Sequence, residues 1–420
     1  MRKQIRGLDK ASSNAQDGVS SVQTAEGALT EVHSMLQRMN ELATQAANGT
    51  NSADDRSAIQ DEVDQLTTEI DRVAETTKFN EIYLLKGDDS STKNVYMKGH
   101  DAGLKGSLTD GAKTATFMMD TLKEGDQYTI AGKEYTIGSA QGDLEALIDK
   151  ADKELTAAAA GTKDVEIDGK KYTLTYKAGG NTIADADGNA VADLATLKGK
   201  IAAGSKVTYG NTTLTAMNDV NGDGVDDDDD SIITTAVAKS KIKAELVTAN
   251  NIGTTDHAAT VADGVDDAAG KTSYTITKGY ATVANTLSFN LHVGADADMT
   301  NKINVSIDTM NSSNLGIKNL NVTDGTGTAA TYAIDAIADA VSKVSSQRSA
   351  LGAVQNRLEH TIDNLDNISE NTSSAESRIR DTDMAKEMVN YSKNNILAQA
   401  GQSMLAQANQ SNQGVLSLLQ

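Results

Sequence analysis

Apolar residues recur at alternating steps of three and four positions along the first part of the chain, which is the spacing of one face of a helix packed against another. This stripe runs from Ile5 to Ala46 and has one polar interruption, Ser12. Residues 48–51 end it with Asn, Gly and Thr, residue types that favour turns. The pattern therefore predicts one long helix followed by a tight turn.

A second helix is predicted directly after the turn. Ser52 is a typical N-cap residue, and the two following aspartates place negative charge in the first helical turn. The helix should end before Phe79, because residues 82–85 form a short apolar run that is typical of a strand. Its apolar stripe consists of Ile59, Val63, Leu66, Ile70 and Val73.

The other end of the chain repeats this periodicity. Residues 334–379 carry a third heptad stripe, in which Arg348 and Thr361 are polar members. Three such stripes from opposite chain ends are buried most simply by packing against one another, which predicts an antiparallel rod with the middle of the chain inserted at its tip. A last amphipathic segment, residues 384–408, has no evident partner stripe in the sequence.

Between about Gly87 and Thr331 the pattern changes to short runs of Tyr, Thr, Val and Ile separated by Gly, Asn and Asp, which is typical of strands and hairpins. Three hairpin patterns resemble one another, and each is followed by a helical pattern. The hairpins are residues 128–137, 165–174 and 207–214, and the helices are 143–155, 190–201 and 231–247. The repeat predicts three hairpin-helix (ββα) units, with further strands at 274–276 and 287–293.

Together these patterns predict a multidomain fold in which a long antiparallel α-helical coiled-coil or bundle rod carries an α+β insertion. The rod should comprise residues 1–87 and 332–380, and the insertion residues 88–331, with subdomains at about 105–250 and 251–331. Residues 381–420 should form a separate C-terminal helix. Because the heptads lie outside it, removal of residues 90–325 is expected to leave the helices intact.

Composition narrows the functions that need consideration. The chain of 420 residues contains no Cys and no Pro, and its formal net charge is −21. The lack of Cys excludes disulfides and thiol nucleophiles, and the lack of Pro favours long helices without kinks. The acidic balance and the 3% aromatic content argue against nucleic-acid binding. No apolar run is long enough for a membrane span, and the first residues do not resemble a secretory signal peptide.

One loop of the insertion carries a cluster of oxygen-bearing side chains. Residues 219–230 fit the twelve-residue calcium loop, in which alternate residues supply ligands and a central glycine, here Gly224, lets the chain turn around the ion. Position 12 is Asp rather than Glu, and position 8, Asp226, is not apolar. The alternative is a solvated acidic turn without an ion. The predicted calcium ligands are Asp219, Asn221, Asp223, the carbonyl of Val225, Asp227 and Asp230.

The sequence contains no recognisable catalytic constellation. Lys271 and Thr272 follow Gly270 as in a phosphate-binding loop, but Val265 stands where that loop requires its first glycine. The histidines are scattered, and none begins the His-Glu-x-x-His zinc motif. We therefore expect a protein that is not an enzyme and that has no cofactor other than the predicted calcium.

Several blocks near the two chain ends resemble bacterial flagellins. They are residues 21–29 (SVQTAEGAL), 36–42, 69–73 and 78–80 at one end, and residues 350–358 (ALGAVQNRL) and 374–383 at the other. The resemblance covers about residues 1–87 and 332–420 but not the middle. It implies a structural subunit of the bacterial flagellar filament, secreted to the extracellular flagellum, which self-assembles through its terminal helices for motility.

The resemblance also implies partners. These are other flagellin subunits, an export chaperone at the C-terminal segment and the flagellin-sensing Toll-like receptor, whereas no nucleic acid or membrane is expected. Arg38, Leu42 and Glu69 match positions through which family members contact that receptor; the alternative is that they are solvent residues or packing contacts between subunits. The chain end matches the family's terminal apolar segment, which is used in filament assembly and read by cytosolic innate sensors; the alternative is a frayed end. The residues of this segment are Val415, Leu416, Leu418 and Leu419.

The sequence departs from the family pattern in one respect. Flagellins carry further residues before the segment that begins here at Met1, including a helix that pairs with the C-terminal one, and we expect this N-terminal segment to be lacking. The apolar face of the stripe from Met384 to Leu419 should then be disordered or self-associating. For the insertion, the alternative function is an adhesin or glycan-binding module displayed on the filament.

Overall fold

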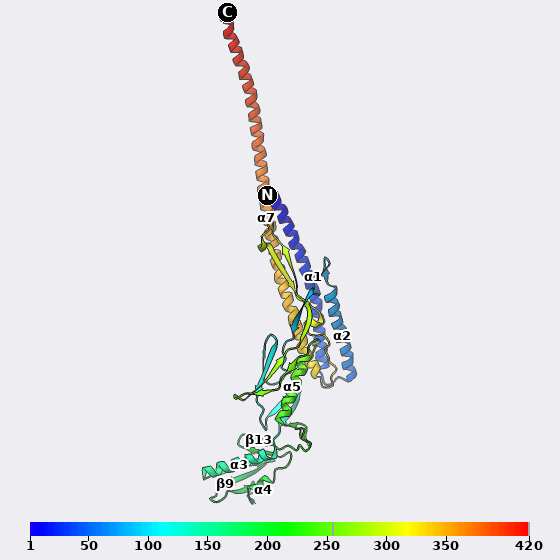
Figure 1. Ribbon diagram of the computed structural model, residues 1–420, viewed down its shortest axis with the longest axis vertical. Helices are drawn as coiled ribbons and strands as arrows, with labels where there is room; N and C mark the ends of the chain where they lie inside the picture. Colours follow the sequence, from blue (N-terminus) through cyan, green and yellow to red (C-terminus); the bar gives the residue numbers. More distant parts are fainter. Residues whose placement is uncertain (254–255, 419–420) are drawn as a thin grey trace.

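A helical rod and an α+β insertion follow one another along the long axis of the molecule in the computed structural model, which describes residues 1–253 and 256–418 (Figure 1). The rod contains α1 (Arg2–Ala46), α2 (Ala53–Thr76) and α7 (Thr328–Leu418). The N terminus lies part-way along α7, and the C terminus lies at the far tip, opposite the insertion. α7 begins at Thr328 rather than at residue 332, and it continues without a break past residue 381, where we had placed a domain boundary.

α1 and α7 run antiparallel, as the stripes predict. Ser369 Oγ donates to Asp9 Oδ1 at 2.8 Å, and Ser12 Oγ donates to Asp366 Oδ1 at 2.9 Å. Ser12 is the polar interruption in the first stripe, and this hydrogen bond satisfies its buried hydroxyl. The polar residue therefore fits the interface because it has a partner on the facing helix.

The turn between α1 and α2 is closed by local polar contacts. Ser52 and Asp55 form a reciprocal capping box at the start of α2. Arg56 is buried and donates from Nε to the carbonyl oxygen of Ala46 at 3.2 Å, next to the end of α1. A cation at this place interacts favourably with the negative end of the helix dipole.

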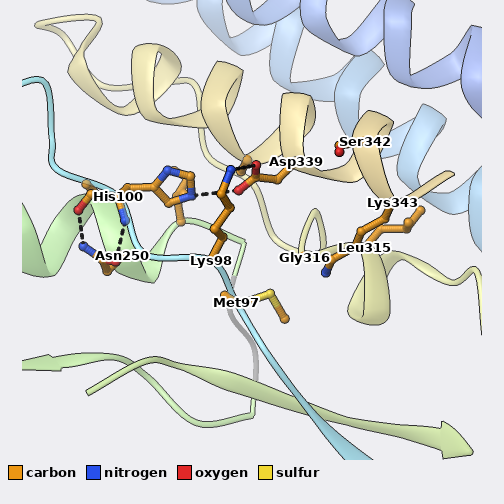
Figure 2. A pocket seen from close by; sticks show the side chains of 12 residues that line it. Met97, Lys98, His100, Asn250, Leu315, Gly316, Asp339, Ser342 and Lys343 are labelled. Atoms are coloured by element: carbon orange, nitrogen blue, oxygen red, sulfur yellow. Dashed lines mark hydrogen bonds and ion pairs between the residues drawn. The ribbon is translucent and has the colours of Figure 1, made fainter. Parts of the chain in front are cut away.

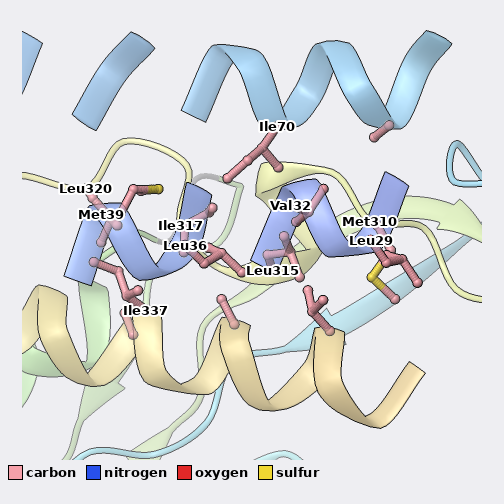
Figure 3. Packing of buried hydrophobic residues seen from close by; sticks show 14 of the residues in the cluster. Leu29, Val32, Leu36, Met39, Ile70, Met310, Leu315, Ile317, Leu320 and Ile337 are labelled. Carbon is pink, nitrogen blue, oxygen red and sulfur yellow. The ribbon is translucent and has the colours of Figure 1, made fainter. Parts of the chain in front are cut away.

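The rod core is built from all three helices and from a segment that returns from the insertion. Figure 3 shows Leu36 of α1 between Ile70 of α2 and Ile337 of α7, together with Ile317 and Leu320. The returning segment begins within β20 (Lys302–Ile307) and contains α6 (Ser312–Leu315). Residues 305–322 therefore contribute to the rod core, so removal of residues 90–325, which we expect to leave the helices intact, would also remove part of that core.

Two-stranded pairs lie along the rod. β1 (Lys78–Phe79) pairs with β2 (Ile82–Tyr83), β3 (Asp88–Tyr96) with β18 (Tyr280–Asn285), and β19 (Leu287–His292) with β20, all antiparallel. β19 approaches α1 at Gly18, where an added Cβ would lie 2.3 Å from Leu291 Cδ1. Glycine at this position allows the β19–β20 hairpin to pack directly on the helix.

The inner part of the insertion has a core around Phe117 and Tyr274. Its larger sheet has the order β15-β17-β5-β4, with β16 also paired to β17: β4 (Ser107–Asp110), β5 (Thr114–Asp120), β15 (Thr260–Val261), β16 (Val265–Asp266) and β17 (Lys271–Thr277). A smaller sheet has the order β14-β7-β6: β6 (Gln127–Ile130), β7 (Lys133–Ile137) and β14 (Ile232–Ile233). α5 (Thr235–Asn251) packs against this core through Ile242 and Leu246.

The outer part has a separate core, formed by one six-stranded sheet and α3 (Gln141–Ala158). The strand order is β11-β10-β9-β8-β12-β13: β8 (Thr162–Ile167), β9 (Lys170–Thr175), β10 (Thr182–Asp185), β11 (Ala190–Val191), β12 (Lys206–Tyr209) and β13 (Thr212–Thr215). A short helix, α4 (Leu194–Lys198), and a 3-10 turn elsewhere, η1 (Met299–Asn301), complete the fold.

The three hairpins are where the repeat predicts them, but they do not form three separate units. The second and third hairpins share the outer sheet, because β8 pairs with β12. Of the helix predicted at 190–201 only the short α4 forms. Residues 190–191 belong to β11 instead, and Asp193 is the N-cap residue of α4. The insertion divides near Ser139 and Ala216 rather than near residue 250, and the outer part is nested within the inner one.

This nesting predicts that the rod keeps its stability when the outer part of the insertion is removed. The chain enters and leaves the outer part side by side, because Ser139 N–H donates to Thr215 O at 2.8 Å and Met217 N–H donates to Ser139 O at 3.0 Å. Replacing residues 140–216 by a short Gly-Ser linker should keep the thermal transition of the rod, measured by circular dichroism. Deleting residues 302–322 should lower it sharply, since it removes part of the rod core. Equal effects of the two deletions would contradict this division.

Candidate functional site

The distal part of α7 presents apolar side chains that nothing in the described chain covers. Every residue from Met384 to Gly414 is exposed, and the side chains of Met388 and Met404 are 69% and 71% exposed. In Figure 1 this orange-to-red part of α7 extends alone beyond the N terminus. Within residues 1–253 and 256–418, no helix is sufficiently long and apolar to cross a membrane. The other large apolar side chains here are Met384, Val389, Tyr391, Ile396, Leu397 and Leu405.

The predicted terminal segment lies at the end of this helix. Leu419 is outside the described residues. Val415, Leu416 and Leu418 belong to α7, but their side chains are also outside the described part of the structure. The exposed surface on which we base the assembly site therefore ends at Gly414.

Arg38 lies on the outer face of α1 next to α2. Its Nε donates to Glu62 Oε1 at 2.8 Å, and its Nη1 donates to Glu41 Oε2 at 3.3 Å. The hydrogen bond to Glu62, followed by that to Glu41, raises the pKa of Arg38. Glu69, which we had grouped with Arg38, instead accepts hydrogen bonds from Arg72, and these lower the pKa of Glu69. Arg38 and Glu69 thus belong to two separate ion pairs on one exposed surface.

Glu62 is the residue that the sequence analysis missed on this surface. It lies between Ile59 and Val63, which are buried against α1, so it stands at the edge of the interface between α1 and α2. This position could have been read from the stripe, because a polar residue flanked by two interface residues faces the neighbouring helix.

Leu42 does not belong to an exposed surface. Its side chain is 2% exposed and is part of the rod core. Leu42 therefore offers a partner of the folded subunit little surface, and its role as a receptor contact stays a prediction. Leu42 is one of the apolar positions that hold α1 in place beneath Arg38.

The acidic loop has the turn geometry expected for residues 219–230. The Asp219 carboxylate accepts the N–H groups of Gly222 at 2.7 Å and Gly224 at 2.9 Å. Gly224 has a φ of +81°, and an added Cβ would lie 2.7 Å from Thr234 Oγ1. Asn221 and Asp223 each accept the N–H two residues further on. Only glycine fits the sixth position of this loop without strain.

The carboxylates in the second half of the loop already bind other groups of the protein. Asp227 accepts from the N–H of Val220 and from Asn221 Nδ2, and Asp230 forms an ion pair with Lys133 at 3.1 Å. Asp226 is buried and accepts three backbone N–H groups, which explains a polar residue at position 8. Val225 forms an isolated bridge with Ile233. In the described chain, no three or more His, Cys, Asp or Glu side chains are grouped so that they could hold a metal ion.

A polar joint connects the insertion to the rod around a cavity of about 210 Å³ (Figure 2). Asp339 of α7 accepts from Lys98 Nζ at 3.0 Å, and its other oxygen lies 3.5 Å from His100 Nε2. Asn250 of α5 holds the backbone of His100 by two hydrogen bonds. Lys343 donates to the carbonyl of Asn314, and burial lowers its pKa. These contacts connect the segment that follows β3 with α5 and α7.

Both ends of the chain match known family models, and related proteins align along nearly its whole length. The family model for the bacterial flagellin N-terminal helical region matches residues 1–90, and that for the C-terminal helical region matches residues 334–419. A flagellin from Clostridium tyrobutyricum is 38% identical over 418 residues, which cover 98% of this chain and 86% of that protein. A flagellin from Salmonella choleraesuis (strain SC-B67) is 33% identical over 453 residues, which cover 99% and 88% of the two chains.

A solved structure of FliC from Burkholderia pseudomallei covers 81% of this chain and 99% of its own at 20% identity, with a TM-score of 0.29. That superposition is too poor to compare the arrangement of domains. The match to the N-terminal family model begins at residue 1. Our expectation that the family's N-terminal segment is lacking is therefore not borne out.

Proposed function

The chain belongs to the bacterial flagellin family, and from this premise we propose which of its surfaces serve assembly, export and recognition. As a flagellin it is a structural subunit of the flagellar filament, an extracellular appendage for motility, and it assembles with other flagellin subunits. Flagellins are structural proteins, so the chain is not an enzyme.

The assembly contact in this proposal is the exposed apolar part of α7, residues 384–414. Large apolar side chains that project from a single helix are unfavourable in water, and packing against other helices removes them from solvent. Neighbouring subunits are the partners present at high local concentration in a filament. The single observation that supports this assignment is the continuous exposure of this segment.

The same face needs protection before assembly. We propose that the subunit is secreted, and that an export chaperone covers the C-terminal segment until the subunit reaches the growing filament. Apolar docking of one helix into a groove is a common mode of helix recognition. In this scheme the chaperone and the neighbouring subunits use the same side chains of α7 in succession.

Recognition by innate immune receptors is proposed for two other surfaces. For the flagellin-sensing Toll-like receptor the residues are Arg38, Glu62 and Glu69, whose side chains are 51%, 44% and 44% exposed. Arginine with carboxylate neighbours provides charged hydrogen-bonding groups in fixed positions. For cytosolic sensors the proposed segment is the chain end, with Val415, Leu416, Leu418 and Leu419.

Calcium is proposed as a ligand of the loop at residues 219–230. Asp219, Asn221, Asp223 and Asp227 lie within this loop, where Gly224 has the conformation that a calcium loop requires. In this proposal Asp230 leaves Lys133 and becomes the sixth ligand, with Val225 supplying a carbonyl. The ion would offset the mutual repulsion of the neighbouring aspartates.

The assembly proposal predicts that charge on α7 prevents filament formation. Met388→Lys combined with Ile396→Lys should abolish filaments seen by electron microscopy, because both side chains must leave water on assembly. The rod should melt at an unchanged temperature, since these residues touch no core. Asn394→Lys, an exposed polar position on the same helix, is the matched control. Normal filaments from the double variant would refute the assignment.

The receptor proposal predicts that Arg38→Ala lowers potency in a Toll-like-receptor reporter assay by about tenfold, the effect of losing one charged interface contact. Arg378→Ala removes an exposed arginine from α7, outside the surface formed by α1 and α2, and should change potency little. A smaller effect of Arg38→Ala than of Arg378→Ala would place the receptor contact elsewhere.

The calcium proposal is tested by thermal melting in millimolar calcium and in chelator. At a free calcium concentration of about a hundred times the dissociation constant, the insertion should gain about 2.7 kcal/mol, while the rod stays unchanged. Magnesium should do less, because it requires octahedral geometry. Lys133→Ala should strengthen binding by freeing Asp230, and Asp219→Ala with Asp223→Ala should abolish it. If the melting curves of the unmutated chain in calcium and in chelator coincide, the loop is only an acidic turn and the calcium proposal is wrong.

A further inference from the structure

The chain contains two Asn-Gly dipeptides, Asn48-Gly49 and Asn221-Gly222. In such a pair the backbone nitrogen of glycine can attack the side-chain carbonyl carbon of asparagine, because glycine has no Cβ to hinder the approach. Asn48-Gly49 forms the turn between α1 and α2, and Asn221-Gly222 lies in the acidic loop. The two sites offer the same local chemistry in different surroundings.

Both asparagines are held in the same kind of Asx turn. Asn48 Oδ1 accepts the N–H of Thr50 at 3.2 Å, and Asn221 Oδ1 accepts the N–H of Asp223 at 2.9 Å. This turn folds the side chain back over the following glycine and brings Cγ close to its nitrogen. The Asx turn alone therefore does not distinguish the two sites.

The nucleophilic nitrogen does distinguish them. Gly222 N–H donates to Asp219 Oδ1 at 2.7 Å, and Asn221 Nδ2 donates to Asp227 Oδ1 at 2.7 Å, so both the attacking and the leaving nitrogen are engaged. Gly49 N–H has no hydrogen-bond partner among the residues that the structure describes. Both Asn48 and Gly49 are exposed, and no atom lies within 4 Å of the position of a Cβ on Gly49.

Arg56 adds a second feature at the first site. Its Nη2 donates to the carbonyl oxygen of Asn48 at 3.4 Å, which is the oxygen of the peptide bond that contains Gly49 N. Drawing electron density toward that oxygen makes the Gly49 N–H more acidic. Arg56 is buried, and within the described residues it forms no ion pair with a carboxylate. A buried guanidinium without a counter-ion favours the gain of a negative charge nearby.

We propose that Asn48 is a site of spontaneous deamidation in the folded subunit, with Arg56 as a positioning residue. Gly49 N loses its proton to solvent and attacks Asn48 Cγ, and the bond from Cγ to Nδ2 breaks as ammonia leaves with a proton from water. The cyclic imide that forms is opened by one water molecule, which yields aspartate or isoaspartate at position 48. No oxidant or reductant is involved.

The modification changes both charge and geometry at the end of the rod. Aspartate places a carboxylate in the turn that contains Arg56, whereas isoaspartate lengthens the backbone by one carbon. The chain next to the longer link is close to the residue before α7, because an added Cβ on Gly327 would lie 2.8 Å from Ala47 O. A subunit that remains in an extracellular filament accumulates this change with time.

The proposal is tested by incubating the purified full chain at mildly alkaline pH and mapping peptides by mass spectrometry. Asn48 should convert about tenfold faster than Asn221, the factor that one charge-assisted hydrogen bond contributes. Gly49→Ala should suppress conversion at Asn48, and Asp219→Ala should accelerate conversion at Asn221. In denaturant the two sites should convert at similar rates. Equal rates in the folded chain, or a slower rate at Asn48, would overturn the proposal.

The role of Arg56 is tested separately by the pH profile of the reaction. Arg56→Gln should shift the rise of the rate at Asn48 to higher pH, and Arg56→Lys should restore part of the profile. A purely structural role would change the unfolding temperature of the rod without shifting this profile. An unshifted profile for Arg56→Gln in the folded chain would remove Arg56 from the proposal and leave the free Gly49 nitrogen as its basis.

Discussion

The apolar stripe of α1 is buried in large part by a helix from the far end of the chain, and the rest of the fold depends on this constraint. Leu29, Val32, Leu36 and Met39 are fully buried, and they pack in a cluster with Ile337 and Val344 of α7. Such burial is the main favourable contribution to folding. Because the two helices must be antiparallel neighbours, the whole segment between them has to leave and re-enter the rod at one end. The insertion is a consequence of this pairing.

Within the insertion the same principle operates once more. The outer part leaves the inner part at Ser139 and returns at Met217, two residues joined by a backbone hydrogen bond of 3.0 Å. Each level therefore closes its own core before the chain continues, and changes in an outer level need not disturb the level beneath it. The exception is the returning segment, residues 305–322, whose apolar side chains complete the rod core. The rod is thus not built from the chain ends alone.

Periodicity and capping chemistry were sufficient to predict the helices of the rod. A repeat of three and four identifies α1, α2 and α7, and the Ser52 cap defines where α2 begins. Residues 317–322 were missed because an irregular segment has no period, and its burial depends on distant partners. The sharing of one sheet by two hairpins was also missed, since strand pairing is a non-local property. For the surface of α1 and α2, the sequence located Arg38 but not its ion-pair partner Glu62, and it did not show that Leu42 is buried.

One mechanical consequence follows from the continuity of α7. Its 91 residues contain no proline and pass from the rod core to the bare tip without a break. The exposed stretch from Met384 to Gly414 alone spans about 45 Å at a rise of about 1.5 Å per residue. Sharp kinks in helices occur most often at proline, so the absence of proline favours a continuous helix axis from the tip to the base. There the joint of Lys98, His100 and Asp339 connects it to the insertion. One unbroken helix therefore connects the tip to the joint that holds the surface domains.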